Sequence, residues 1–194
     1  MAETMIPDVD ETELVIRAQK GDRNAYSELV SLHSRGVLNV IYRMCGDAQL
    51  AEDAAQETFI RAWSHLGSFR TEASLRNWLY RIALNTATDM LRREKHILPG
   101  AMDDLQLVDP GLSPEGLFIE QEQTNLVQQA IRSLPDSSRQ VLVLKEYEGL
   151  SYREIADALE IPIGTVMSRL NYARGFLREK LEGKLAMFKE VERV

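Results

Sequence analysis

The sequence has little of what several protein classes require. It contains one cysteine, Cys45, which excludes an intrachain disulfide and a cysteine-rich zinc site. No apolar run approaches the roughly 20 residues that cross a bilayer. The first 13 residues have neither a basic nor an apolar stretch, so we expect no secretory signal and a cytoplasmic protein.

Sequence motifs for catalysis are also missing. There is no glycine-rich phosphate loop, no Gly-x-Ser-x-Gly and no His-Glu-x-x-His, and the three histidines are scattered. Asp53 and Glu57 lie four residues apart on one helix face, but no matching carboxylate pair is evident elsewhere. We therefore expect no enzyme activity, no metal and no cofactor. A metal-dependent activity of the isolated chain would contradict this.

Charge is distributed unevenly along the chain. The net charge of −7 is concentrated in residues 1–13, which contribute −5, and in residues 96–123, which contribute −6, and neither segment contains Lys or Arg. Residues 14–95 carry +3 and residues 124–194 carry +1. Two mildly basic blocks are thus joined by an acidic connector. The overall acidity therefore does not exclude nucleic-acid binding, because local charge steers it.

The pattern of both basic blocks indicates helices, and no sustained alternation indicates a strand. Three dipeptides that contain proline, between residues 99 and 114, predict an extended linker. The expected fold class is all-α, with two small helical domains joined by an extended acidic linker. The expected helices lie near 12–20, 23–44, 49–65, 74–94, 116–133, 136–148, 152–159 and 163–182.

The end of the second block predicts a DNA-binding helix-turn-helix. Ser151 and Glu154 can form a capping box on a short helix, and a tight turn over 161–164 precedes the next helix. Two-helix hairpins also occur in proteins that do not bind DNA. An apolar stripe on the second helix leaves short polar, basic and aromatic side chains outside it, the types that contact base edges and phosphates, namely Thr165, Ser168, Arg169, Asn171 and Tyr172.

The helix over 74–94 has a polar face as well. Its expected buried stripe consists of Leu75, Trp78, Leu79, Ile82, Thr86 and Met90. The loop before it places Phe69 and Arg70 beside hydroxyl groups. An unstacked base needs an apolar surface and edge hydrogen bonds, which this loop could supply. The alternative is a solvated helix with Phe69 in the core. The polar face consists of Asn77, Arg81, Asn85, Thr88 and Arg92.

Three segments together resemble one family. They are residues 51–63 (AEDAAQETFIRAW), residues 68–93 (SFRTEASLRNWLYRIALNTATDMLRR) and residues 134–178, which contain GTVMSRLNYAR. They are similar to regions 2.2, 2.3–2.4 and 4 of bacterial sigma-70 factors of the extracytoplasmic-function (ECF, group IV) type. The order, the spacing and the short acidic linker match that family, and no region 3 domain lies between them.

The resemblance implies an alternative sigma factor, monomeric when free. Such a protein binds bacterial core RNA polymerase and directs promoter-specific transcription initiation. It reads the −35 element as duplex promoter DNA and melts the −10 element. Control by an anti-sigma factor, often membrane-bound, is implied too, as is a linker path toward the RNA exit channel. The implied divisions are an acidic N-terminal tail at 1–13, sigma region 2 at 14–95, the linker at 96–121, the sigma region 4 helix-turn-helix at 122–185 and a C-terminal tail at 186–194.

The resemblance also assigns binding residues. For core polymerase these are Asp53, Gln56 and Glu57, with Phe59 and Trp63 as apolar support. For the −10 element they are Phe69, Arg70, Thr71, Ser74, Asn77, Arg81, Asn85 and Arg92. For the −35 element they are Thr165, Met167, Ser168, Arg169, Asn171, Tyr172 and Arg174. Met167 departs from the Arg or Lys common in the family, and a methionine contacts a thymine methyl but cannot donate to guanine.

Two other functions stay open from the residues. A one-component regulator with a LuxR-like helix-turn-helix would account for 134–182 but not for the motifs at 51–93. An inactive sigma homologue could act as a scaffold. Cys45 is either a redox switch or a small packed residue at a helix end.

Overall fold

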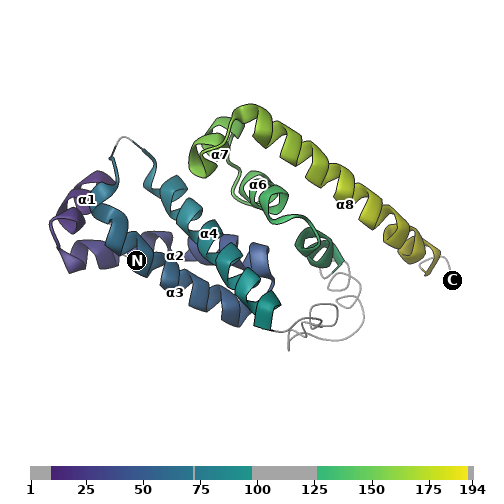
Figure 1. Cartoon of the computed structure of the whole chain (residues 1–194), viewed down its shortest axis with the longest axis horizontal. Coiled ribbons are helices and arrows are strands. Elements are labelled where there is room, and N and C mark those ends of the chain that lie inside the picture. The colour runs from purple at the N-terminus through teal and green to yellow at the C-terminus, as the bar shows by residue number, and fades with distance from the viewer. Residues whose placement is uncertain (1–9, 72, 98–125, 192–194) are drawn as a thin grey trace, which may run out of the picture.

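The computed structural model describes residues 10–71, 73–97 and 126–191, with side chains over 10–71, 73–94 and 126–182. Every regular element in these ranges is helical, which confirms the all-α class (Figure 1). The expected linker lies outside the described residues, apart from residues 96 and 97, which continue a helix. The elements are α1 (Glu11–Gln19), α2 (Arg23–Cys45), α3 (Ala48–His65), the short 3-10 helix η1 (Leu66–Ser68), α4 (Leu75–Ile97), a helical segment over 126–132, α6 (Asp136–Glu146), α7 (Tyr152–Leu159) and α8 (Ile163–Val191).

Side-chain caps set most of the helix starts. Asp10, Asp22 and Asp47 each accept hydrogen bonds from backbone N–H groups in the first turn of α1, α2 and α3. The predicted capping box of α7 is present, since Ser151 and Glu154 each satisfy the other's backbone N–H. Gly46 ends α2 at a φ of 71°, a conformation that glycine adopts without steric cost.

The C-terminal limits of α4, α6 and α8 differ from expectation. Helix α8 continues to Val191 rather than ending near 182, so the expected C-terminal tail is helical as far as residue 191. Helix α4 likewise continues to Ile97 rather than ending near 94, whereas α6 ends at Glu146 rather than near 148. These differences lie at helix ends, where periodicity gives the weakest signal.

Helices α1 to α4, called the region 2 unit below, form one bundle. Helix α2 packs against α1, α3 and α4, and α3 packs against α4. The bundle buries Leu14, Leu29, Ile41, Leu66 and Leu84 almost completely, which places its core between α2 and α4. Cys45 belongs to this core at 5% exposure, and burial raises the pKa of its thiol. The thiol is thus a packed group in the protonated form.

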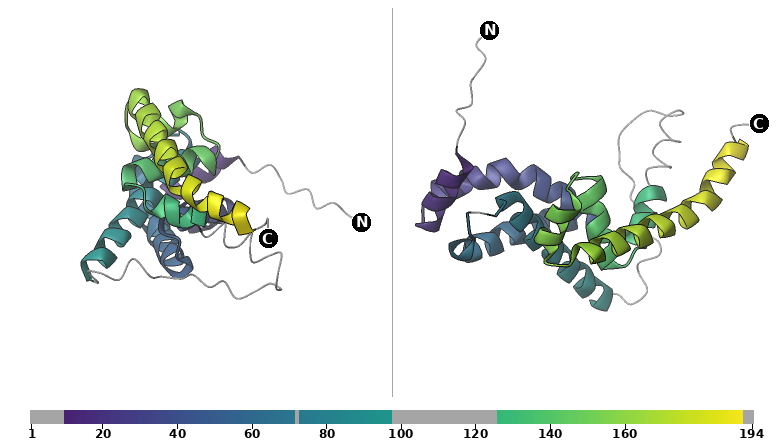
Figure 2. Two further views of the ribbon diagram at one scale, coloured as in Figure 1. Left: turned by 90° about the vertical axis from the view of Figure 1, so that its right-hand side faces the viewer. Right: turned by 90° about the horizontal axis from the view of Figure 1, so that it is seen from above.

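Helices α6 to α8, called the region 4 unit below, form a second bundle in which α8 packs on α6 and α7. It lies directly on the first, because α4 packs against α7 and α2 packs against α6. The ribbon views show the two units side by side (Figures 1 and 2). None of the described helices is both long enough and apolar enough to cross a membrane.

Helix α4 packs both within its own unit, on α2 and α3, and against α7 of the region 4 unit. The expected stripe is only partly right, since Leu75, Leu79 and Thr86 are buried but Trp78, Ile82 and Met90 are half-buried. A second stripe is buried as well, made of Tyr80, Leu84, Ala87, Thr88 and Leu91. Thr88 was expected on the exposed face, yet it is 6% exposed and accepts a 3.1 Å hydrogen bond from Gln140 of α6. Helix α4 is therefore buried on two sides.

Candidate functional site

The helix-turn-helix of the region 4 unit presents the predicted residues on α8. Val166, Leu170 and Ala173 are fully buried against α6 and α7. The opposite side of the helix centres on Ser168, Asn171 and Tyr172, all exposed. Thr165 and Arg169 lie half-buried at one edge of this side, and Met167 and Arg174 lie exposed at the other. The structure therefore brings the seven predicted −35 residues together on one exposed helix side.

Several of these side chains have partners inside the unit. The Ser168 hydroxyl donates to the Thr165 carbonyl oxygen at 3.0 Å. The Nη2 of Arg174 donates to Oε1 of Glu146 at 2.8 Å, and this hydrogen bond raises the pKa of Arg174. The Tyr172 ring stacks on Phe176 with ring centroids 6.2 Å apart, while 53% of the residue stays exposed. Arg174 is thus held at the edge of the unit, and Tyr172 offers an accessible ring supported from behind.

The loop before α4 is anchored from α1. The Nε2 of Gln19 donates to the carbonyl oxygens of Leu66 and Phe69 at 3.0 and 2.8 Å. Phe69 is only 7% exposed and packs on Trp78 with ring centroids 5.1 Å apart, so its ring forms part of the core. Arg70 is exposed. Sequence reasoning missed Gln19, because its partners lie 47 and 50 residues away.

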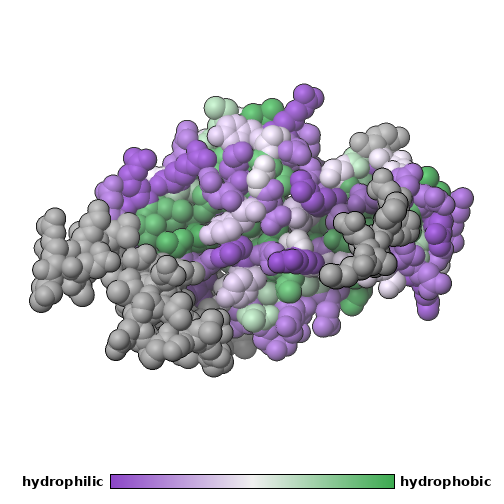
Figure 3. Space-filling view, turned by 180° about the vertical axis from the view of Figure 1, so that it is seen from behind, coloured by the Kyte–Doolittle hydropathy of each residue, from purple (hydrophilic) through white to green (hydrophobic). Residues whose placement is uncertain are grey.

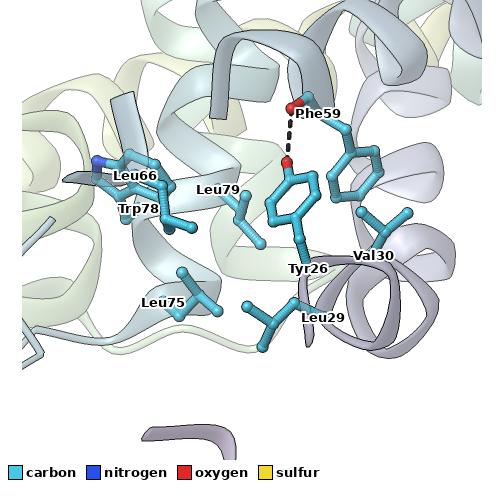
Figure 4. A pocket seen from close by; sticks show the side chains of 8 residues that line it. All are labelled: Tyr26, Leu29, Val30, Phe59, Leu66, Leu75, Trp78 and Leu79. Carbon is cyan, nitrogen blue, oxygen red and sulfur yellow. Dashed lines mark hydrogen bonds between the residues drawn. The ribbon is translucent and has the colours of Figure 1, made fainter. Parts of the chain in front are cut away.

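An apolar pocket lies next to this loop, between α2, α3 and α4 (Figure 4). Its only hydroxyl, that of Tyr26, donates to the carbonyl oxygen of Phe59 at 2.6 Å and is not free for a ligand. The pocket offers an apolar surface rather than hydrogen bonds to a base edge. It is lined by Tyr26, Leu29, Val30, Phe59, Leu66, Leu75, Trp78 and Leu79.

The predicted −10 residues divide into two groups. Arg70, Thr71 and Ser74 are exposed in the loop, where Ser74 also accepts a 3.3 Å hydrogen bond from the Asn77 backbone N–H. The Asn77 side-chain oxygen is buried without a partner in the described part of the chain.

Farther along α4, the second group faces the region 4 unit or solvent. The Nη2 of Arg81 donates to Glu160 at 2.6 Å, and Asn85 is exposed. Arg92 lies 3.6 Å from an Asp136 carboxylate oxygen.

The outward face of α3 contains the residues predicted to bind polymerase. Asp53 and Gln56 are exposed, while Glu57 is half-buried and accepts from Arg61 at 2.7 Å. Phe59 and Trp63 pack against the core of the unit. At the centre of this face stands Ile60, which is 62% exposed and which sequence reasoning missed.

A signal for Ile60 was available in the sequence. The buried stripe of α3 is Ala51, Ala54, Thr58 and Ala62, and Ile60 points away from it at helical spacing. A space-filling view shows hydrophilic side chains over much of one face of the molecule, interrupted by apolar areas (Figure 3). Single exposed apolar residues are common, so the exposure of Ile60 alone does not indicate a binding site. The polar residues around it on α3 are what make it a candidate.

Comparison with known proteins identifies the family. A model of sigma-70 region 2 matches residues 29–97, and a model of sigma-70 region 4 matches residues 124–177. The chain is 36% identical to the RNA polymerase sigma-H factor of Pseudomonas aeruginosa over 92% of this chain and 97% of that protein. It is 37% identical to the ECF RNA polymerase sigma factor SigW of Bacillus subtilis over 85% of this chain and 93% of that protein. This chain belongs to the ECF sigma factor family.

Solved structures agree with the fold of this ECF sigma factor. CnrH in complex with the cytosolic domain of CnrY superposes with a TM-score of 0.67 and 24% identity, over 89% of this chain and 97% of that one. The sigma factor RpoE of Bartonella quintana, in complex with the anti-sigma factor NepR, superposes with a TM-score of 0.64 and 22% identity. The match covers 81% of this chain and 96% of that one. Family membership confirms the predicted resemblance, and it makes the chain a transcription-initiation protein rather than a regulator of the LuxR-like type.

Within the described residues, no group of three or more His, Cys, Asp or Glu side chains is arranged to hold a metal ion. The Asp53 and Glu57 pair on α3 therefore has no third ligand among them, and Glu57 is engaged by Arg61.

Proposed function

We propose that this ECF sigma factor binds core RNA polymerase through α3, reads the −35 duplex with α8 and opens the −10 element with the loop 67–74 and α4. The observation that carries the proposal is α8, where an exposed set of polar, basic and aromatic residues lies opposite a fully buried stripe. A recognition helix in the major groove needs that combination, one side packed and the other free.

On α8, we infer that Ser168, Asn171 and Tyr172 contact base edges. Arg169, at the edge of this exposed side, would contact a phosphate or a guanine. Arginine is the common donor to guanine, and asparagine pairs with adenine edges. Met167 is 48% exposed, so its side chain is available to a thymine methyl. We therefore infer that the −35 element has a thymine at the base that Met167 contacts. The Arg or Lys more common in the family at this position would instead donate to that base.

At the −10 element, the free energy of strand opening has to come from binding. Extruding a base costs a few kcal/mol, which stacking and hydrogen bonds must offset. Because Phe69 is buried against Trp78, we infer that its ring is the apolar wall behind a captured base rather than a free stacking surface. Arg70 and Thr71, both exposed in the loop, supply the polar groups for that base.

For polymerase binding, we infer that Ile60 is the apolar anchor of the α3 face. Binding energy at protein interfaces concentrates in a few central residues that become desolvated, with polar residues around them. Ile60 stands at 62% exposure between Asp53, Gln56 and Glu57, which matches that arrangement.

We infer that a separate anti-sigma protein controls this factor in the cytoplasm, where it is monomeric when free. The structures of CnrH with the cytosolic domain of CnrY and of RpoE with NepR support such a partner, since both folds resemble this one. We infer a partner that is held at the membrane, since CnrH is bound by a domain of CnrY that is cytosolic.

Reconstituted transcription tests the proposal. Purified chain and bacterial core polymerase are mixed with a pool of genomic promoter fragments, and transcript starts are mapped by sequencing. We expect starts that depend on the chain and that share a two-part upstream motif. Arg169→Ala should reduce these transcripts, whereas Arg178→Ala, an exposed arginine more than two turns farther along α8, should not. Core binding without any specific transcript would favour the inactive scaffold.

A further inference from the structure

Gln19, the last residue of α1, is hydrogen-bonded to the backbone at the start of the −10 loop, residues 67–74. We propose that Gln19 is a positioning residue for strand opening, which holds this loop in the conformation that captures an extruded base. It acts through the loop backbone rather than by contact with DNA. The proposal rests on the proposed function, because it assigns a supporting residue to the loop named there. The match to the region 2 model begins at residue 29 and does not include α1.

Both hydrogens of one amide group serve this contact. The Gln19 Nε2 donates to the carbonyl oxygen of Leu66 at 3.0 Å and to that of Phe69 at 2.8 Å. A glutamine amide has two N–H donors, so each carbonyl takes one. Leu66 and Phe69 are the two ends of a tight turn, since the Phe69 N–H donates to the Leu66 carbonyl oxygen at 3.0 Å. Gln19 therefore joins both ends of this turn from a different helix.

The Phe69 carbonyl depends on Gln19. Phe69 has extended backbone, with φ at −69° and ψ at 133°, so its carbonyl lies outside any helical hydrogen-bond ladder. Among the described residues, Gln19 is the donor that this carbonyl receives. Because Phe69 is buried, an unpaired carbonyl there would cost free energy that the Gln19 bond avoids. The bond thus favours this conformation of the loop over others.

The same bond sets the direction of Arg70. A trans peptide group is planar, so the Phe69 carbonyl oxygen and the Arg70 N–H point in opposite directions within one rigid plane. Since Gln19 holds that oxygen toward α1, the Arg70 N–H points away from α1. The direction in which the chain continues to Arg70 and Thr71, the two exposed residues that we assign to the captured base, is fixed with it.

Phe69 is consequently held on two sides. Its ring packs on Trp78 of α4, and its carbonyl is held by Gln19 of α1. Figure 4 shows Leu66 and Trp78 lining the apolar pocket beside the loop. A wall that is in place before DNA arrives lowers the ordering cost of base capture, because the loop loses less conformational freedom on binding.

Helix α1 is itself firmly attached, which makes Gln19 a rigid support. The helix packs on α2 and on η1, and Leu14 is buried in the core of the region 2 unit. Arg17 donates to Asp22, the N-cap of α2, at 2.7 Å, and Glu11 lies 2.9 Å from a ring nitrogen of His33. A side chain carried by a packed helix holds its partners more exactly than one carried by a loop.

The alternative is a purely structural role, in which the Gln19 bonds stabilise the unit without affecting base capture. The two roles differ in one ratio, that of the affinities for a −10 strand with and without the captured base. Loss of folded protein lowers both affinities alike and leaves this ratio unchanged. A displaced loop lowers the affinity for the intact strand alone, because specificity is a difference between two affinities.

The test compares three substitutions of the full chain, each assembled with core polymerase. Gln19→Met keeps the side-chain length but removes the N–H donors, and Gln19→Lys restores donors at similar reach. Gln129→Met is the control, at an exposed glutamine of the segment 126–132 whose side chain makes no hydrogen bond within the described residues. We measure the affinity for a fluorescent single strand of the −10 element identified by transcript mapping, and for the same strand with an abasic site at each position in turn.

We expect the wild type and Gln129→Met to lose about tenfold in affinity at one abasic position, since a stacked base contributes that much. Gln19→Met should bind the intact strand about tenfold more weakly and bind the intact and abasic strands nearly equally. Gln19→Lys should restore a ratio of at least about threefold.

A wild-type ratio in Gln19→Met would overturn the proposal whatever the absolute affinity, and so would a lost ratio that Gln19→Lys fails to restore. If the wild-type holoenzyme gives no specific transcripts, or loses no affinity at any abasic position, the proposed function of the loop is itself wrong, and this proposal with it.

Discussion

Ile60 offers the sharpest test of polymerase binding. Full burial of an isoleucine side chain contributes about 1.5–3 kcal/mol, and 62% of this residue is exposed in the free chain. Covering that fraction at an interface would contribute about 1–2 kcal/mol, which is roughly 5- to 30-fold in affinity. Ile60→Ala should therefore weaken core-polymerase binding by about this factor and leave thermal stability nearly unchanged.

The assay is a titration of fluorescently labelled chain with core polymerase, and the control is Leu32→Ala. Leu32 is 59% exposed on α2, so the two substitutions remove similar apolar surface from the free chain. We expect Leu32→Ala to bind polymerase like wild type. The reasoning is wrong if the two variants bind equally well, or if Ile60→Ala lowers the melting temperature by more than a few degrees.

The remaining predictions concern the DNA surfaces and the fold around them. Tyr172→Ala should weaken −35 duplex binding about tenfold, because a lost base contact costs about 1–3 kcal/mol, and core binding measured in parallel should not change. Phe69→Ala should lower the unfolding free energy by about 3–5 kcal/mol, so the informative variant is Phe69→Leu, which should slow open-complex formation but not closed-complex formation in footprinting. Hydrogen bonding to Ser151 lowers the pKa of Glu154 below its usual 4.5, so its stabilising effect is present above that value and is lost as pH falls below it. Thermal melts from pH 6 to pH 3 should show a smaller loss of stability in Glu154→Gln than in wild type.

Local signals in the sequence were sufficient for the helices. Asp22 and Ser151 mark helix starts through their own side chains, and Gly46 marks an end because its φ is positive. The exposed side of α8 was also predictable, since it follows from a 3.6-residue period. These features depend on residues within one or two turns of each other.

The packing of the two units was not predictable in this way. Arg139 lies 95 residues from Met44, and nothing near it in the sequence distinguishes it from a solvated arginine. Thr88 was assigned to an exposed face for the same reason, because periodicity identifies one buried stripe and cannot show that a second body covers the opposite one. Gln19 is a third example, joined to a loop far along the chain.

The energetics of the interface identify which contacts hold the units together. Arg81 and Glu160 are 38% and 63% exposed at their side chains, and exposed ion pairs contribute little, typically about 0–1 kcal/mol. The Tyr80 contact with Glu148 and the buried Arg139 contact with Met44 are shielded from water, so losing either partner leaves a buried group unsatisfied. We therefore infer that the buried contacts hold the two units together and that the exposed pair of Arg81 and Glu160 adds little to their association. Added salt should accordingly weaken the exposed pair before it affects the buried contacts.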